Sequence, residues 1–335
     1  MLPRHSAVTL EQVARQAGVS RATVSRIVNG VSTVDPALAE RVNVVVKQLG
    51  YVPNLSARSL ASRRAGAVAL VVPEDVERFF GDPFFGALVA GIQGKMRGSG
   101  FLLDVLIAAD DPRQTSDLLL GGKVDAAILF SHRIEQSFMS MMSASLPVVL
   151  AGRPSDATEP TCHYVDVDNR GGAEFVTRHL LERGHRRIAM IRGPEDSPAA
   201  ADRLQGYLDA HEAAGIEPGP IVAGDFTSAG GVAAAERLLD EGASCTAVFA
   251  ANDLMAIGTM GVLRRRGLRI PDDIAVAGFD DVPSAADTVP PLTTVRQPSR
   301  EQGAALAEAA LALVAGEQVE QGQVLATELI VREST

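Results

Sequence analysis

Two arginines near the N-terminus lie among hydroxyl and amide side chains on one face of a predicted helix. Over residues 21–29 the apolar side chains of Val24, Ile27 and Val28 are spaced to face inward. The opposite face then carries Arg21, Ala22, Ser25, Arg26 and Asn29. An Arg guanidinium can bind guanine O6 and N7 with two hydrogen bonds, whereas hydroxyls and amides mostly bond phosphates. The pattern predicts a helix that reads the DNA major groove; the alternative is a solvated helix pair without a ligand.

A second predicted helix and a tight turn position this face. Thr9 and Gln12 can form a capping box at the start of a helical pattern over residues 10–17. Gly18 allows the left-handed conformation that ends a helix, and Ser20 is a good N-cap for the next one. Two short helices joined in this way are typical of a helix-turn-helix.

A third helix is predicted from the N-cap Asp35 and Pro36 to Leu49, and residues 50–54 stop it. Residues 55–61 form one further short helical stretch, in which Leu60 is apolar among small and polar neighbours.

Five short motifs follow one another along residues 8–60: Val8-Thr9-Leu10, Ala17-Gly18-Val19-Ser20, Thr23-Val24-Ser25-Arg26, Gly50-Tyr51-Val52-Pro53-Asn54 and Ala57-Arg58-Ser59-Leu60. In these motifs the chain resembles the headpiece of the lactose/galactose repressor (LacI/GalR) family, and the resemblance extends over its whole length.

The resemblance implies a role for each matched residue. Arg21, Ala22 and Arg26 would face bases, Ala22 through a methyl contact alone. The residues implied to hold phosphates are Thr9, Ser20, Thr23, Ser25 and Asn29. Tyr51, Asn54, Ala57 and Arg58 belong to the implied DNA-binding set as well.

Leu60 is implied to be a wedge inserted from the minor groove. A helix of about two turns is too short to be stable alone, so it should fold only on DNA and beside a partner hinge. An apolar side chain driven between base steps kinks the duplex. The alternative is that Leu60 packs on the neighbouring domain.

Charge is divided unevenly along the chain. The 335 residues carry a net charge of −10, yet the first 64 contain nine Lys or Arg and three Asp or Glu. A basic head on an acidic body directs polyanions to one end of the molecule.

No segment is long and apolar enough to span a membrane, and residues 1–5 do not resemble a secretion signal. Cys162 and Cys245 lie in no metal or redox spacing, which favours reduced, structural thiols. We therefore expect a cytoplasmic protein that associates with the nucleoid through operator binding and has no cofactor and no metal site.

From about residue 67 apolar strands alternate with helical patterns. The candidate strands are Val68–Val72, Leu102–Ile107, Ala126–Phe130, Val148–Leu150, Tyr164–Val167, Ile188–Ile191, Ala247–Ala250 and Ile274–Ala277. This alternation predicts parallel, doubly wound sheets, and the number of strands favours two lobes with a ligand site in the cleft between them.

The family resemblance makes the organisation specific. It implies an all-α helix-turn-helix headpiece (residues 1–53), a hinge helix and linker (54–64), and a two-lobed α/β core of periplasmic-binding-protein-like type (65–335). The N-lobe would comprise about 65–166 plus 297–324, and the C-lobe about 167–296 plus 325–335. The chain would cross between lobes near Asp166–Asp168, Val295–Gln297 and Leu325.

Core motifs that match the family include Asp82-Pro83-Phe84-Phe85, Ala251-Asn252-Asp253 and Ala277-Gly278-Phe279-Asp280-Asp281. The effector-binding positions that the resemblance implies are Arg203, Phe226, Asn252, Asp280 and Gln297. These groups suit a polyhydroxylated ligand, because amides and charged groups direct hydrogen bonds and a ring offers an apolar platform.

Each position also has an alternative. Asn252 could cap the helix that follows it, Asp280 and Asp281 could cap or turn a strand end, and Arg203 could pair on the surface. The sequence departs from the family at Ala151-Gly152-Arg153-Pro154, where an acid is frequent, and at Ala199–Ala201. A smaller or less hydroxylated effector than a hexose therefore stays open.

Catalysis is not indicated. His179 and His185 are six residues apart, and His185 follows Gly184 at a predicted helix end. No dinucleotide or phosphate-binding glycine motif is present.

We therefore expect a regulator, most simply a repressor, that binds a palindromic double-stranded operator as a homodimer under the control of a small molecule, a sugar or sugar derivative. Apolar residues of two helices, Leu88, Ile92, Met255 and Ile257, are candidates for the dimer interface or for the core. The alternative functions are a solute-binding receptor of a transport system and an enzyme of carbohydrate metabolism.

Overall fold

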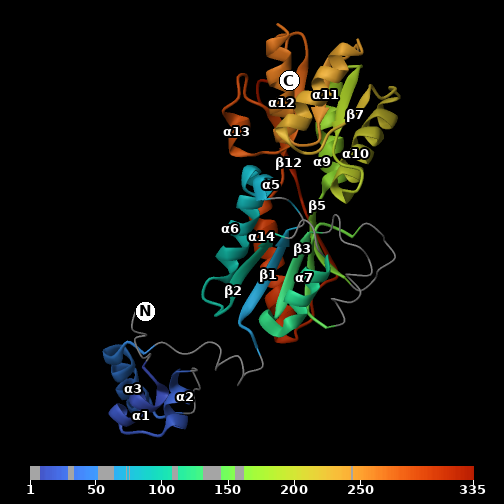
Figure 1. Ribbon diagram of the computed structural model, residues 1–335. Coiled ribbons are helices and arrows are strands. Elements are labelled where there is room, and N and C mark those ends of the chain that lie inside the picture. The colour runs from blue at the N-terminus through green and yellow to red at the C-terminus, as the bar shows by residue number, and fades with distance from the viewer. Residues whose placement is uncertain are drawn as a thin grey trace. The chain divides into compact units, whose positions relative to one another are not determined.

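The computed structural model describes most of the chain as two units, Met1–Ala65 and Gly66–Thr335 (Figure 1). The described residues are 8–28, 34–51, 64–72, 74, 76–107, 112–130, 145–154, 162–242 and 244–335.

The N-terminal unit contains the three predicted helices, α1 (Leu10–Ala17), α2 (Arg21–Val28) and α3 (Pro36–Leu49). The capping box of Thr9 and Gln12 is present, and Gly18 ends α1 in the left-handed conformation with φ 66°. Asp35 caps α3 through the backbone N–H groups of residues 37 and 38. Because both ends of α1 and of α3 are capped, these two short helices begin and end at defined residues.

A small apolar core holds the three helices together. Its buried members are Val13, Ala14, Ala17, Val24, Val42, Val45 and Tyr51. They come from all three helices and from the turn after α3, so the orientation of α2 depends on packing against both neighbours.

The first lobe of the larger unit, here the N-lobe, is built on a six-stranded parallel sheet of order β11-β5-β4-β3-β1-β2. Its strands are β1 (Ala67–Val72), β2 (Leu102–Ile107), β3 (Ala126–Phe130), β4 (Val148–Ala151), β5 (His163–Val167) and β11 (Gly322–Leu325). The helical segments are α5 (Val76–Gly81), α6 (Pro83–Met96), α7 (Pro112–Leu118), the π-helical turn η1 (Leu119–Lys123) and α14 (Ser299–Ala315).

The second lobe, the C-lobe, has a sheet of order β12-β10-β9-β8-β6-β7. Its strands are β6 (Ile188–Arg192), β7 (Ile221–Ala223), β8 (Ala247–Ala250), β9 (Ala275–Asp280), β10 (Thr293–Arg296) and β12 (Glu328–Ile330). The helices are α9 (Asn169–Glu182), α10 (Pro198–Ala214), α11 (Ser228–Asp240), α12 (Asp253–Arg265) and α13 (Pro283–Ala286).

The chain passes between the two sheets after β5, after β10 and after β11, as the order of elements shows. Each lobe therefore contains segments far apart in the sequence, and three connections link the lobes (Figure 1).

The predicted fold class is confirmed, with two differences. β7, β10, β11 and β12 are absent from the predicted strands, and β12 pairs antiparallel with β10 although only parallel pairing was expected. These four strands are short, and β7 and β11 have exposed residues at their edges, so their sequences lack the continuous apolar run of a central strand.

The residues proposed for either interface or core are now assigned. Leu88, Ile92 and Met255 are fully buried in the lobes, and Ile257 is partly buried against the C-lobe core. They pack the interior of the chain. Among the described residues, no helix is long and apolar enough to cross a membrane.

Helices α6 and α14 approach each other closely because each carries a glycine at the contact. A Cβ at Gly91 would lie 2.0 Å from the carbonyl oxygen of Arg300, and one at Gly303 would lie 2.1 Å from that of Leu88. Backbone atoms cannot move away from an added Cβ without a shift of the whole helix.

We predict that Gly303→Ala lowers the free energy of unfolding by about 1–3 kcal/mol, because the added methyl group forces α6 and α14 apart. Gly94→Ala is the matched control on α6, since a Cβ there meets nothing within 4 Å. It should stabilise the helix by about 0.5–1 kcal/mol. Urea denaturation of the two variants tests this, and equal stabilities would contradict the packing argument.

Candidate functional site

The predicted reading face is present on α2. Arg21, Ala22 and Arg26 are exposed, while Val24 is buried beneath them. Arg21 forms an ion pair with Glu11, 3.1 Å between Nε and Oε1. Two cations on an exposed helix face beside a tight turn are suited to major-groove contacts.

The hydroxyls near this face already have structural partners. Ser20 Oγ accepts a hydrogen bond from the backbone N–H of Thr23 and lies 2.8 Å from its Oγ1, and the Thr9 hydroxyl caps α1. Ser25 is half-buried, and Tyr51 is packed in the core of the headpiece with 9% of its surface exposed. Phosphate contacts by these residues stay predictions. Asn29, Asn54, Ala57, Arg58 and Leu60 lie outside the described residues.

The second site is a cavity between the two lobes of the larger unit. It includes all five predicted effector positions: Arg203, Phe226, Asn252, Asp280 and Gln297. The other lining residues are Arg78, Asp82, Phe84, Phe85, Phe130, Ala151, Gly152, Asp166, Val167, Asn169 and Gln302. Many of them end or follow strands β3, β4, β5, β8, β9 and β10, as expected for ligand sites of doubly wound sheets.

Arg203 of α10 lies at the centre of this cavity wall. Its Nε donates to Asn169 Oδ1 at 2.9 Å, and its Nη1 donates to the backbone oxygen of Ala251 at 2.5 Å. The guanidinium also stacks on the Phe279 ring, 3.7 Å from the ring centroid. Desolvation lowers the pKa of this group, while the charge of Asp280 opposes the shift. Arg203 is buried, so the alternative of a surface ion pair is wrong.

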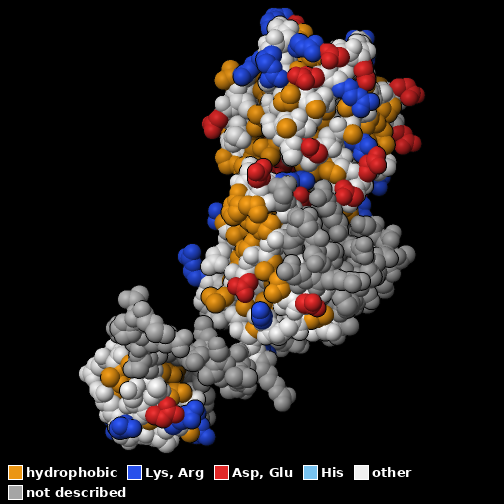
Figure 2. All heavy atoms as spheres, viewed as in Figure 1, with side chains coloured by type: hydrophobic (Ala, Val, Ile, Leu, Met, Phe, Trp, Pro, Cys, Tyr) orange, Lys and Arg blue, Asp and Glu red, His pale blue; other side chains and the backbone are white. Residues whose placement is uncertain are grey.

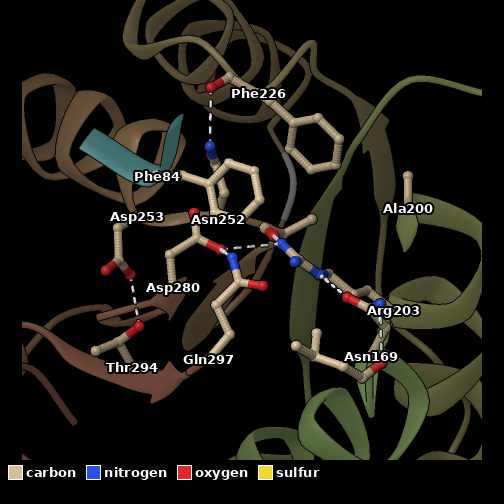
Figure 3. Close-up of polar contacts among 12 residues, drawn as sticks. Phe84, Asn169, Ala200, Arg203, Phe226, Asn252, Asp253, Asp280, Thr294 and Gln297 are labelled. Atoms are coloured by element: carbon tan, nitrogen blue, oxygen red, sulfur yellow. Dashed lines mark hydrogen bonds and ion pairs between the residues drawn. The ribbon is translucent and has the colours of Figure 1, made fainter. Parts of the chain in front are cut away.

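Asp280 supplies the opposing charge. Its Oδ1 lies 3.4 Å from Arg203 Nη1 and accepts a hydrogen bond from Gln297 Nε2 at 2.7 Å (Figure 3). Its backbone has φ 121°, a conformation that residues other than glycine rarely adopt. Burial raises the pKa of Asp280 well above its ordinary value, and the Arg203 charge counteracts this.

Asn252 both caps a helix and lines the cavity. Its Oδ1 accepts from the Met255 backbone N–H at 3.0 Å, and its Nδ2 donates to the Phe226 backbone oxygen at 2.8 Å. Phe226 itself has φ 67°. The capping alternative for Asn252 is therefore confirmed together with its place in the cavity, and the cap holds the strained Phe226 segment in position.

Several wall residues were missed in the sequence. Asp82, Phe84 and Phe130 come from the N-lobe, and Phe84 extends toward the same space as Phe226 (Figure 3). Asp166 and Asn169 flank the first lobe crossing, and Asn169 Nδ2 donates to Asp166 Oδ1 at 3.1 Å. In the sequence, the matched motif at residues 82–85 was the one signal that could have identified Asp82 and Phe84.

Desolvation also raises the pKa of Asp82 and of Asp166, and backbone N–H donors oppose the shift at both. With Asp280, three carboxyl groups line a cavity that contains the Arg203 guanidinium. Such a wall offers acceptors in several directions beside the donors of Arg203. It is suited to the hydroxyl groups of a sugar more than to an anion.

The catalytic alternatives gain no support. His179 and His185 contact different threonines, Thr335 and Thr246, through their rings. Burial lowers the pKa of both. Within the described part of the chain, no group of three metal-ligating side chains comes together, and Cys162 and Cys245 are free thiols.

A headpiece with two exposed arginines on α2 and a cavity lined by both lobes of the larger unit are together typical of the class of ligand-controlled DNA-binding regulators. Residues 9–54 match the model of bacterial regulatory proteins of the lacI family, and residues 177–335 match a periplasmic binding protein-like domain.

Relatives align over almost the whole chain. The transcriptional regulator CelR of Thermobifida fusca is 43% identical, covering 99% of this chain and 100% of its own. The transcriptional repressor CytR of Escherichia coli is 33% identical, covering 99% and 97%. The chain belongs to the LacI family of transcriptional regulators, and these named relatives are regulators rather than enzymes.

Two solved structures are similar across both units. A CelR–cellobiose complex has a TM-score of 0.78 at 42% identity, covering 98% of this chain and 100% of that one. A lac repressor dimer bound to operator and an anti-inducer has a TM-score of 0.87 at 28% identity, covering 98% and 99%.

One buried carboxyl beside the site gives a pH prediction. Asp253 accepts hydrogen bonds from the Thr294 hydroxyl at 2.6 Å and the Val282 backbone N–H at 2.9 Å. Burial raises the pKa of Asp253 to about 7 despite these donors. Since its unfolded pKa is near 3.9, the folded state binds the extra proton between about pH 4 and 7.

Asp253 therefore contributes stability at low pH that is lost as pH rises toward 7. We expect the free energy of unfolding of the parent chain to fall as the pH rises from 4.5 to 7.5, and that of Asp253→Asn to fall by on the order of 2 kcal/mol less. Urea denaturation at each pH measures both. In Asp273 the partner Arg269 lowers the carboxyl pKa, so this group is ionised in both states above about pH 4.5 and Asp273→Asn should leave the slope of the profile in this range unchanged. Parallel profiles for the parent and Asp253→Asn would contradict the assignment.

Proposed function

We propose that this chain is a transcriptional repressor that binds a palindromic operator as a homodimer, under the control of cellobiose or a closely related glucoside in the cleft. The observation that carries the proposal is the convergence of Arg203, Asp280 and Gln297 with two aromatic rings on one cavity. The named complex of CelR with cellobiose supports the choice of ligand, because CelR aligns along the full length of this chain.

The two rings favour a sugar. Phe84 belongs to the N-lobe and Phe226 to the C-lobe, and both line the cavity. An apolar sugar face can pack against each ring while its hydroxyls bond the Asp280 and Gln297 side chains. A wall made by both lobes lets the ligand affect the angle between them.

Exposed apolar residues of the N-lobe support the homodimer. Val76 and Phe80 of α5 are 57% and 75% exposed, and Leu102 and Val105 of the edge strand β2 are also exposed. Figure 2 shows hydrophobic side chains gathered over α5 and α6. Apolar surface of this kind marks protein contacts, and the lac repressor dimer is a relative with the same fold.

The function is tested by selecting duplexes from a random library with the purified protein, then measuring their affinity with and without cellobiose. We expect a palindromic sequence whose affinity cellobiose changes by about 5- to 150-fold. A solute-binding receptor would show no preference among duplexes. An enzyme would convert the sugar, which product analysis would detect.

Phe226→Ala should weaken cellobiose binding roughly tenfold to a hundredfold, because about 1.5–3 kcal/mol of apolar burial is lost. Phe175→Ala is the matched control, since Phe175 is on α9 at the surface and contacts Arg178. Calorimetry on both variants measures the effect, and equal affinities would remove Phe226 from the site.

Arg26→Ala should cost about 1–3 kcal/mol of operator affinity and relax base preference at one position. Arg41→Ala on the exposed surface of α3 removes the same charge outside the reading face. If Arg26→Ala weakens every duplex equally, Arg26 contacts phosphate alone.

A further inference from the structure

One ion pair joins the two lobes beside the cavity. Arg153 follows β4 of the N-lobe, and Asp202 is on α10 of the C-lobe. Nε lies 2.6 Å from Oδ2, and Nη2 lies 2.7 Å from Oδ1. Both side chains are partly buried, at 35% and 23% exposure. A bidentate pair that is shielded in this way is stronger and more directional than an exposed ion pair.

The pair is connected to the cavity by a ring of hydrogen bonds. The Arg153 backbone N–H donates to Asp166 Oδ2 at 2.9 Å, and Asp166 Oδ1 accepts from Asn169. Asn169 in turn accepts from Arg203, which directly follows Asp202 in α10. The ring therefore connects the lobes at two places, through the Arg153–Asp202 ion pair and through the Asp166–Asn169 hydrogen bond beside the first crossing.

Local backbone geometry places both partners. Gly152 has φ 97°, which turns the chain after β4 and directs Arg153 toward the C-lobe. Asp202 lies near the start of α10, which Ser197 caps.

The cavity between the lobes is small in this structure. Its volume is about 110 Å³. This is less than the ~150 Å³ of an engineered cavity that holds benzene. A disaccharide therefore needs the cleft to widen, and widening separates Arg153 from Asp202.

We propose that the Arg153–Asp202 pair is a latch between the lobes, which holds the cleft in its contracted arrangement and so opposes effector binding. The inference rests on the proposed control by a ligand in the cleft. Without the latch the widened arrangement gains population, and its preferred ligand binds more tightly. By linkage, loss of the latch changes operator affinity in the same direction as saturating effector does.

The test compares the full chain with Asp202→Asn, Arg153→Gln and the charge-exchanged double variant Arg153→Asp with Asp202→Arg. Calorimetry measures cellobiose affinity, and titration of the selected operator duplex measures DNA affinity. We expect each single variant to bind cellobiose about fivefold more tightly or better. The double variant should return toward the parent value.

Asp209→Asn is the matched control. Asp209 lies on the same helix and pairs with Arg170 at 2.5 Å, but both belong to the C-lobe. It should leave both affinities unchanged. Single variants equal to the control, or a double variant without rescue, would overturn the latch.

If none of the chains binds cellobiose, the proposed effector is wrong and the latch is tested directly. Hydrogen exchange of the N-lobe segment 145–154 is then measured in parent, Asp202→Asn and Asp209→Asn. Faster exchange in Asp202→Asn alone supports the latch, because that substitution is in the other lobe. Equal exchange in all three overturns it.

Discussion

The buried guanidinium of Arg203 is the constraint on which the ligand-binding unit depends. A cation removed from water must be compensated, and here Asp280, Asn169, the Ala251 carbonyl and the Phe279 ring surround it. These partners come from the ends of β8 and β9 and from the start of α9, so one charge fixes the relative positions of three elements. Arg203 and Gln297 also hold the strained residue Asp280 in place, and Asn252 holds the strained backbone at Phe226.

The compensating network also reaches the connections between the lobes. Asn169 directly follows the first crossing, and Gln297, bonded to Asp280, lies at the second. A ligand that exchanges hydrogen bonds with Arg203 or Asp280 therefore acts on the residues that set the angle between lobes. In the proposed mechanism this network is the two-state element, since the ligand needs only to differ in affinity between two arrangements of the lobes.

Much of the fold could be predicted from the sequence, because central strands such as β1, β3 and β8 are continuous apolar runs and the headpiece helices carry explicit caps. The short edge strands β7 and β12 could not, since their pairing is decided by neighbours far away in the chain. In the site, the C-lobe residues follow recognisable motifs. In the N-lobe wall, Asp82 and Phe84 lie in a matched motif, whereas Phe130 carries no such signal. All three face the C-lobe residues only because the lobes come together. The cap formed by Asn252 shows that a structural and a ligand-facing role can coincide in one side chain.

The central claim is that the cleft and the DNA-reading helix share one equilibrium. It is tested most directly by measuring cellobiose affinity of the protein twice, free and saturated with its selected operator. Thermodynamic reciprocity requires the two affinities to differ by the same factor by which cellobiose changes operator affinity, about 5- to 150-fold. Tight cellobiose binding with one affinity in both states would show that the cleft and the headpiece are uncoupled, and would contradict the account.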